Sequence, residues 1–197
     1  MFRVSTALVA TLSVCLLMAR ITIAGNTETS FDDLLARARG GDAQAQNQVG
    51  EALADGNGVQ RNDFDAVRWF QKAALQGRVD AQYNLSVMFA NGQGVRQDDA
   101  ETVKWSRLAA KQGHPGAQYQ LGLLYAVGAG LKQDYVQAYK WFSLAADRLT
   151  DMDEEIARED RDLVAKKMTS EQVAEAQRLV REWKPEDALP VLAAKDA

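Results

Sequence analysis

The chain repeats one pattern of residues three times at a period of 36, and this regularity restricts its fold more than any other feature. The copies span residues 42–77, 78–113 and 114–149 without an insertion. Matching positions hold Ala45, Ala81 and Ala117; Val49, Leu85 and Leu121; Gly56, Gly92 and Gly128; and Trp69, Trp105 and Trp141. A fixed period between about 20 and 50 residues is typical of solenoids, in which each unit buries its apolar side against its neighbours. The sequence therefore predicts a repeat protein.

Each copy predicts two helices joined by a glycine-containing turn. In the middle copy, Ala81, Leu85 and Phe89 recur every four residues, which indicates one apolar side of a helix. Gly92 follows where a left-handed residue can end that helix. Asp98 then has the residue type of an N-cap, with Glu101 three residues later as in a capping box. We expect the second helix of each copy to place its Trp between adjacent units.

The segments after the third copy no longer follow the period. Residues 151–168 predict a charged helix, and residues 170–183 predict a final one that Thr169 and Gln172 cap. The apolar side of the charged helix is expected to hold Met152, Ile156, Leu163 and Val164. We interpret residues 150–184 as capping helices and residues 185–197 as a loose tail.

The N-terminal segment divides into a targeting signal and a short helix. Arg3 precedes an apolar run over residues 4–19, and Ala24 ends a stretch typical of a cleavage site, so residues 1–24 predict a secretory signal. The run is shorter than the roughly 20 residues of a membrane-spanning helix. Because Arg20 follows the run, an uncleaved anchor is the alternative. Residues 31–39 predict a helix that is the second half of an incomplete repeat, so that the solenoid covers residues 25–149.

Composition excludes several classes of function. Without residues 1–24 the chain has 21 basic and 27 acidic side chains, a net charge of −6, which disfavours binding to nucleic acid. Its single Cys lies within the signal, and its single His, His114, lies in a turn between two copies, so we expect no metal, cofactor or catalytic residue. The glycine turns follow helices and lack the Lys-Ser/Thr of a phosphate-binding loop, so we interpret them as structural.

The residues also resemble a known family. The pattern A-x-x-x-L-G-x-x-[YF]-x-x-G-x-G-V, followed by D, W and A-A-x-x-G, is similar to the Sel-one-like repeat, a relative of the tetratricopeptide repeat. The resemblance covers residues 31 to about 149, with Ser86 in place of a helix Gly and Thr102 in place of Ala. It implies an all-α solenoid (superhelix) of three helix–turn–helix repeats, with the first helices lining its concave side.

The same resemblance implies a non-enzymatic scaffold or adaptor of the bacterial envelope, which binds a protein or peptide and can act in regulation. With the predicted signal, it indicates an exported protein, periplasmic or secreted, without a membrane span after cleavage. A hydrolase of cell-wall or β-lactam compounds is one alternative, although that activity is associated with cysteine-rich relatives whose disulfides this chain lacks. A structural subunit of an envelope complex is another.

Residues that vary between the copies on the first helices are candidates for partner binding. They change from polar and acidic to apolar along the chain: Gln48, Glu51 and Asp55 in the first copy; Asn84, Val87 and Asn91 in the second; Gln120, Leu123 and Val127 in the third. Tyr83 and Tyr119 are close to them in sequence, and aromatic side chains are favoured at interfaces. We predict that these residues form the concave binding face. Alternatively, Val87, Leu123 and Val127 pack beneath the C-terminal helices.

Overall fold

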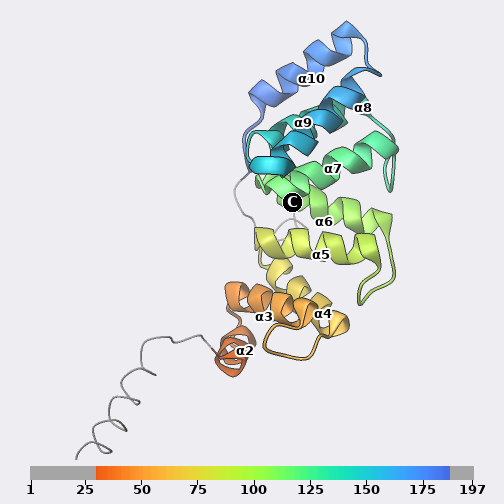
Figure 1. Ribbon diagram of the computed structural model, residues 1–197. Helices are drawn as coiled ribbons and strands as arrows, with labels where there is room; N and C mark the ends of the chain where they lie inside the picture. Colours follow the sequence, from red (N-terminus) through yellow and green to blue (C-terminus); the bar gives the residue numbers. More distant parts are fainter. Residues whose placement is uncertain (1–29, 187–197) are drawn as a thin grey trace, which may run out of the picture.

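The computed structural model describes residues 30–186, and the predicted signal and residues 187–197 of the predicted tail lie outside this range. Within it the chain forms nine helices and no strand (Figure 1). Their bounds are α2 Phe31–Arg39, α3 Ala43–Asp55, α4 Asp63–Leu75, α5 Val79–Asn91, α6 Asp99–Lys111, α7 Pro115–Val127, α8 Tyr135–Ala146, α9 Asp151–Ala165 and α10 Ser170–Glu182. None of these helices is long and apolar enough for a bilayer crossing. The predicted all-α solenoid is confirmed.

The helices stack in the order of the sequence. Each helix from α2 to α8 packs against the next one, so that α3/α4, α5/α6 and α7/α8 form the three predicted repeats. Alanines at matching positions, among them Ala45, Ala81 and Ala117, are fully buried between the helices. Since a larger side chain there would overpack the interface, the repeated Ala positions allow the close approach of neighbouring helices.

The second helix of each repeat begins at the predicted N-cap. Side chains of Asn62, Asp98 and Asp134 each accept a hydrogen bond from the backbone N–H three residues later. The reciprocal half of a capping box is not formed at Asp98. Glu101 instead accepts from the indole Nε1 of Trp105 at 2.8 Å, and so holds a nearly buried Trp in place. Thr169 and Gln172 do form the reciprocal box, with 2.9 Å between Thr169 N and Gln172 Oε1.

The turns inside the repeats need glycine for two different reasons. The first glycine of each turn adopts a left-handed conformation and ends the helix, as at Gly92 with φ 65°. In the second and third repeats, the second glycine also lies close to the preceding repeat: a Cβ at Gly94 would overlap the carbonyl of Asp63, and one at Gly130 the carbonyl of Asp99. The turns therefore act as contacts between repeats as well as connections.

Helix α9 continues the stack, although its sequence no longer follows the repeat. It buries Ala157 and Val164 against α8, while Met152, Ile156 and Leu163 remain exposed. The predicted apolar side of this helix was therefore wrong in three of its four residues. Small Ala157 faces α8 because the fully buried Ala145 and nearly buried Ala146 of α8 lie at this contact, where larger side chains would not fit.

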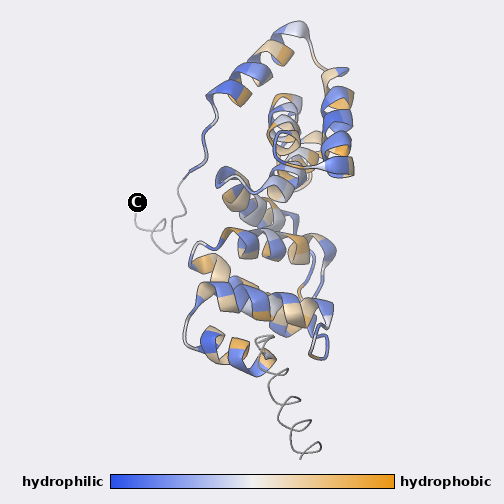
Figure 2. Ribbon diagram, turned by 60° about the vertical axis from the view of Figure 1, so that its left-hand side comes forward, coloured by the Kyte–Doolittle hydropathy of each residue, from blue (hydrophilic) through white to orange (hydrophobic). Residues whose placement is uncertain are grey.

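The chain returns to the middle of the solenoid after α10. Helix α10 packs on α8, and the segment 183–186, here called the C-terminal strap, leads back toward α6 (Figure 2). Trp183 lies over the guanidinium of Arg148 at 4.8 Å. The N–H of Glu186 donates to the carbonyl of Lys111 at 2.8 Å, and the two side chains form an ion pair at 3.0 Å. The predicted tail is thus attached near its beginning, at Glu186.

Candidate binding surface on the first helices

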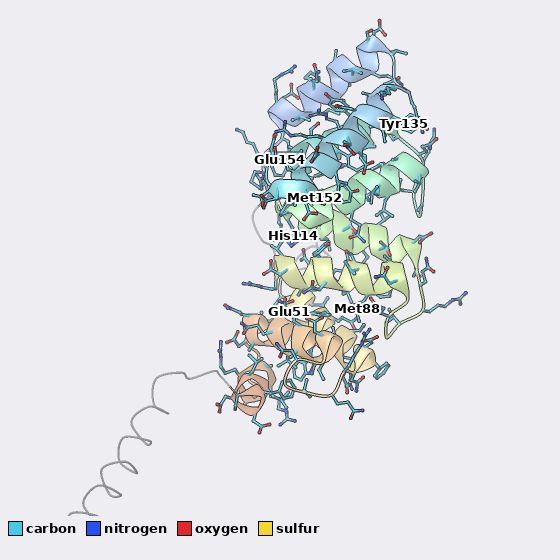
Figure 3. All side chains as sticks on the ribbon, in the orientation of Figure 1. Glu51, Met88, His114, Tyr135, Met152 and Glu154 are labelled. Atoms are coloured by element: carbon cyan, nitrogen blue, oxygen red, sulfur yellow. The ribbon has the colours of Figure 1, made fainter. Side chains whose placement is uncertain are left out.

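The first helices of successive repeats form one surface, here called the first-helix surface, to which α3, α5, α7 and α9 contribute (Figure 3). Side-chain hydrogen bonds connect each of these helices to the next. Asn84 of α5 donates to Asn47 of α3 at 3.1 Å. Ser86 of α5 lies 2.7 Å from the amide oxygen of Gln120 on α7. Tyr119 of α7 donates to Asp160 of α9 at 2.7 Å.

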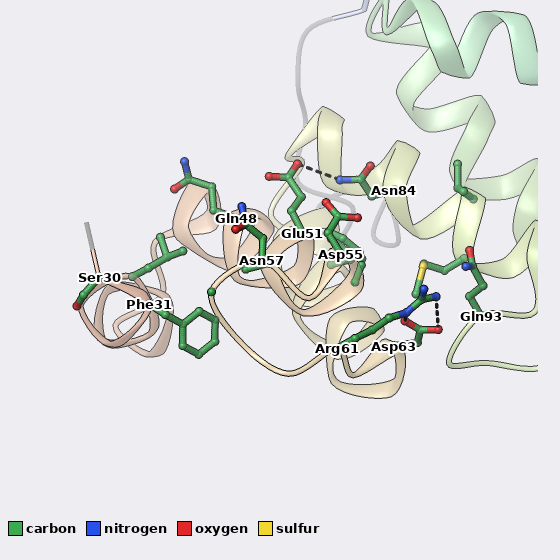
Figure 4. A pocket seen from close by; sticks show the side chains of 17 residues that line it. Ser30, Phe31, Gln48, Glu51, Asp55, Asn57, Arg61, Asp63, Asn84 and Gln93 are labelled. Carbon is green, nitrogen blue, oxygen red and sulfur yellow. Dashed lines mark hydrogen bonds and ion pairs between the residues drawn. The ribbon is translucent and has the colours of Figure 1, made fainter. Parts of the chain in front are cut away.

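A groove of about 1150 Å³ opens on this surface between α2, α3 and α5, beside the turn that leads into α4. Five of the predicted binding residues border it: Gln48, Glu51, Asp55, Asn84 and Val87. Apolar side chains add to its lining, including Phe31, Leu34, Phe70 and Met88 (Figure 4). Sequence reasoning did not find the contribution of α2, because the period alone does not show that the incomplete repeat borders a groove.

The groove is acidic. Among the described residues that line it, the only cation is Arg61, which forms a bidentate ion pair with Asp63 at 2.8 and 2.9 Å, and this contact lowers the pKa of the Asp63 carboxyl. Glu51 accepts hydrogen bonds from the side-chain amides of Asn47 at 2.8 Å and Asn84 at 3.3 Å. Within residues 30–186, neither Glu51 nor Asp55 has an ion-pair partner. Two carboxylates therefore remain available to a ligand.

Three other predicted binding residues make contacts inside the protein. Tyr83 stacks on His114 with 4.4 Å between the ring centroids. Tyr119 is held by Asp160, and Gln120 lies between Ser86 and Ser106. Burial raises the pKa of both tyrosines; the Asp160 hydrogen bond further raises that of Tyr119, and the charge of Asp153 raises both.

Gln120 compensates for a departure of the second repeat from the pattern. In the first and third repeats, Gly50 and Gly122 lie against the rings of Phe70 and Phe142, so that a Cβ would come within 2.6 Å of the ring. The second repeat has Ser86 and Ser106 at these positions. The amide oxygen of Gln120 lies 2.7 Å from the Ser86 hydroxyl and 3.0 Å from that of Ser106, and so occupies the space of the missing ring.

An exposed apolar patch lies toward the C-terminal end of the same surface. Leu123 and Val127 of α7 are 38% and 70% exposed, which rules out the alternative that they pack beneath the C-terminal helices. On α9, Ile156 and Leu163 flank Asp160 at helical spacing, and Asp160 contacts Tyr119, one turn before Leu123. The exposed large apolar residues of α7 and α9, here together called the apolar patch, are Leu123, Val127, Met152, Ile156 and Leu163. Of the predicted binding residues, Asn91 is exposed at the end of α5.

His114 has a structural task. Its Nδ1 accepts the backbone N–H of Ala117 at 3.2 Å and so caps α7, and burial lowers the pKa of its imidazole. In residues 30–186 no three His, Cys, Asp or Glu side chains are grouped so that they could hold a metal ion.

The stacked helix pairs define an α-solenoid repeat protein. The Sel1 repeat model matches residues 43–77, 79–114 and 115–148, which is more than half of the chain. The chain belongs to the Sel1 repeat family.

Solved structures give the same result. The chain is similar to c5321, described as a protective antigen present in uropathogenic Escherichia coli strains with an SLR fold, at 35% identity and a TM-score of 0.71 over 87% of this chain and 36% of that one. A Sel1 repeat protein from Oxalobacter formigenes also has 35% identity, with a TM-score of 0.57 over 64% of this chain and 96% of that one. The chain thus spans about a third of the length of c5321. The comparison with curated proteins gave no match.

Proposed function

We propose that this protein is a non-enzymatic scaffold of the bacterial envelope that binds a protein or peptide on its first-helix surface, in an adaptor or regulatory role. The observation that carries the proposal is the exposure of Leu123 and Val127 on the same surface as an acidic groove. Contiguous exposed apolar side chains on a folded protein are typical of interaction sites. Solenoid proteins use such extended surfaces for binding. The envelope location rests on the predicted signal.

A crosslinked pull-down tests the proposal. Residues 25–197 are incubated with the envelope fraction of the source organism, both as wild type and as Leu123→Asp/Val127→Asp, and captured proteins are identified by mass spectrometry. A partner found with the wild type is expected to be lost with the double variant, because aspartate carboxylates cannot be buried against an apolar partner without a large desolvation cost.

Phe64→Asp is the matched control, since Phe64 is an exposed large apolar residue on α4, away from the proposed surface. It is expected to retain the partner, and circular dichroism should show the same helix content in all three proteins. Equal capture by the wild type and the double variant, or capture of no partner by the wild type, would contradict the proposal.

A further inference from the structure

The charges on the first-helix surface restrict the kind of partner that it can bind. At the N-terminal end, Glu51 and Asp55 border the groove on successive turns of α3, and Arg61, the one cation of its lining in residues 30–186, is already paired with Asp63. An occupant that covered these two carboxylates would remove them from water. Burying an unpaired carboxylate is costly unless a positive charge or hydrogen-bond donors accompany it.

The C-terminal end of the surface is acidic as well. Helix α9 carries seven acidic and only two basic side chains, and one of the latter, Arg158, is paired with Glu154 at 2.6 Å. Asp160 accepts a hydrogen bond from Tyr119 of α7, and neither Asp160 nor Asp153 forms an ion pair within the described residues. The apolar patch is therefore surrounded by negative charge.

An acidic partner would be repelled at both ends of the surface, and a purely apolar one would leave the carboxylates of the groove without counter-charges. From this complementarity we infer that the partner is a protein segment that combines Lys or Arg with large apolar side chains. A cation of the segment pairs with Glu51 and Asp55, and its apolar side chains pack on the floor of the groove and on the apolar patch. This inference rests on the proposed function, since it specifies the ligand of the same surface.

Selection from a display library tests the charge preference directly. Random twelve-residue peptides are selected on residues 25–197, and the affinities of the enriched peptides are then measured by fluorescence polarisation. We expect enrichment of sequences with Lys or Arg next to Leu, Phe or Trp. For these peptides, Glu51→Gln/Asp55→Asn should weaken binding about tenfold or more, and raised salt should weaken binding to the wild type.

The double variant is designed to leave the fold unchanged. Gln at position 51 keeps an acceptor oxygen for the amides of Asn47 and Asn84, and Asp55 is exposed at the end of α3. Asp99→Asn/Asp147→Asn is the matched control, because it changes the net charge equally at exposed positions outside the groove. This control should bind the selected peptides with wild-type affinity.

The outcomes separate this inference from the proposed function. Enriched peptides without basic residues, or cationic peptides that bind Glu51→Gln/Asp55→Asn as tightly as the wild type, would overturn the inference and leave a peptide-binding scaffold. If Asp99→Asn/Asp147→Asn lost as much affinity as Glu51→Gln/Asp55→Asn, the charge effect would be non-specific, and the inference would also be overturned. Absence of any enriched peptide would count against the peptide-binding function itself, and the inference would fall with it.

Discussion

Residues at the same position of two repeats can lie in different environments in this protein, one at the surface and one in a buried contact. Gln48 and Gln120 are separated by two periods and occupy the same position on α3 and α7. Gln48 borders the groove, whereas Gln120 lies against the fully buried Ser86 and Ser106. The sequence period predicts on which side of a helix a residue lies. It does not predict that a departure in the preceding helix, Ser106 in place of Phe, draws the side chain inward.

Gln120→Ala is expected to lower the free energy of unfolding by about 1–3 kcal/mol, because two buried hydroxyls lose a hydrogen-bond partner. Gln48→Ala should change it by less than about 0.5 kcal/mol, as is usual for surface positions. Urea unfolding followed by circular dichroism measures both variants. Equal stability of the two variants would show that the polar contact at Gln120 does not stabilise the fold.

Among the elements, the turns and the helix ends were predicted well and the side of α9 was not. Caps and left-handed glycines depend on local chemistry, so the residue types at Asp98 and Gly92 were sufficient. Helix α9 has two candidate apolar sides about 100° apart. Because α9 does not follow the repeat, no equivalent position in another copy shows which of the two sides is buried. Burial of Ala157 instead of Ile156 depends on the alanines of α8, and hence on a tertiary contact.

The second glycine of each turn allows a test of the contact between repeats. Gly94→Ala and Gly58→Ala both place a Cβ in a left-handed conformation, with φ near 70°, which costs about 1–2 kcal/mol. Only the Cβ at Gly94 also overlaps backbone of the preceding repeat; at Gly58 nothing lies within 4 Å. We therefore expect Gly94→Ala to lower the free energy of unfolding by about 1–3 kcal/mol more than Gly58→Ala does.

Thermal and urea unfolding of the two glycine variants provide the comparison, and Gly130→Ala serves as a second example of the crowded position. If Gly58→Ala proved as destabilising as Gly94→Ala, the turns would be connections only, without a role in stacking.

At the scale of the whole molecule, the C-terminal strap connects the end of α10 to α6, two elements that are not neighbours in the stack of helices. Val180 and Trp183 pack with Trp141 and Leu144 of α8, and Glu186 is bound to the end of α6. Arg148, beneath the Trp183 ring, donates to the carbonyl of Gly113 at 3.0 Å, between the second and third repeats. Sequence analysis predicted the helices that cap the solenoid, but the path of the strap depends on contacts between residues far apart in the chain.

Trp183→Ala is expected to lower the free energy of unfolding by about 2 kcal/mol or more through the loss of this packing. Hydrogen exchange should become faster in α8 and α10 and remain unchanged in α3, because α3 makes no contact with the strap. Lys184→Ala, at the exposed neighbouring position, is the control and should behave as wild type. Uniformly faster exchange in all helices would instead indicate that the protein unfolds as a single unit.

The strap also determines how the molecule responds to mechanical force. In a linear stack, tension applied at the two ends can detach one terminal repeat after another, because each unit contacts only its neighbours. Here Glu186 is bound to Lys111 of the second repeat, so that tension from the C-terminal side passes through this contact to α6. Helices α7 to α10 then form a closed loop that carries no tension while the contact holds. We therefore expect extension of the C-terminal half to begin with rupture of that contact, while the N-terminal repeats bear the force directly.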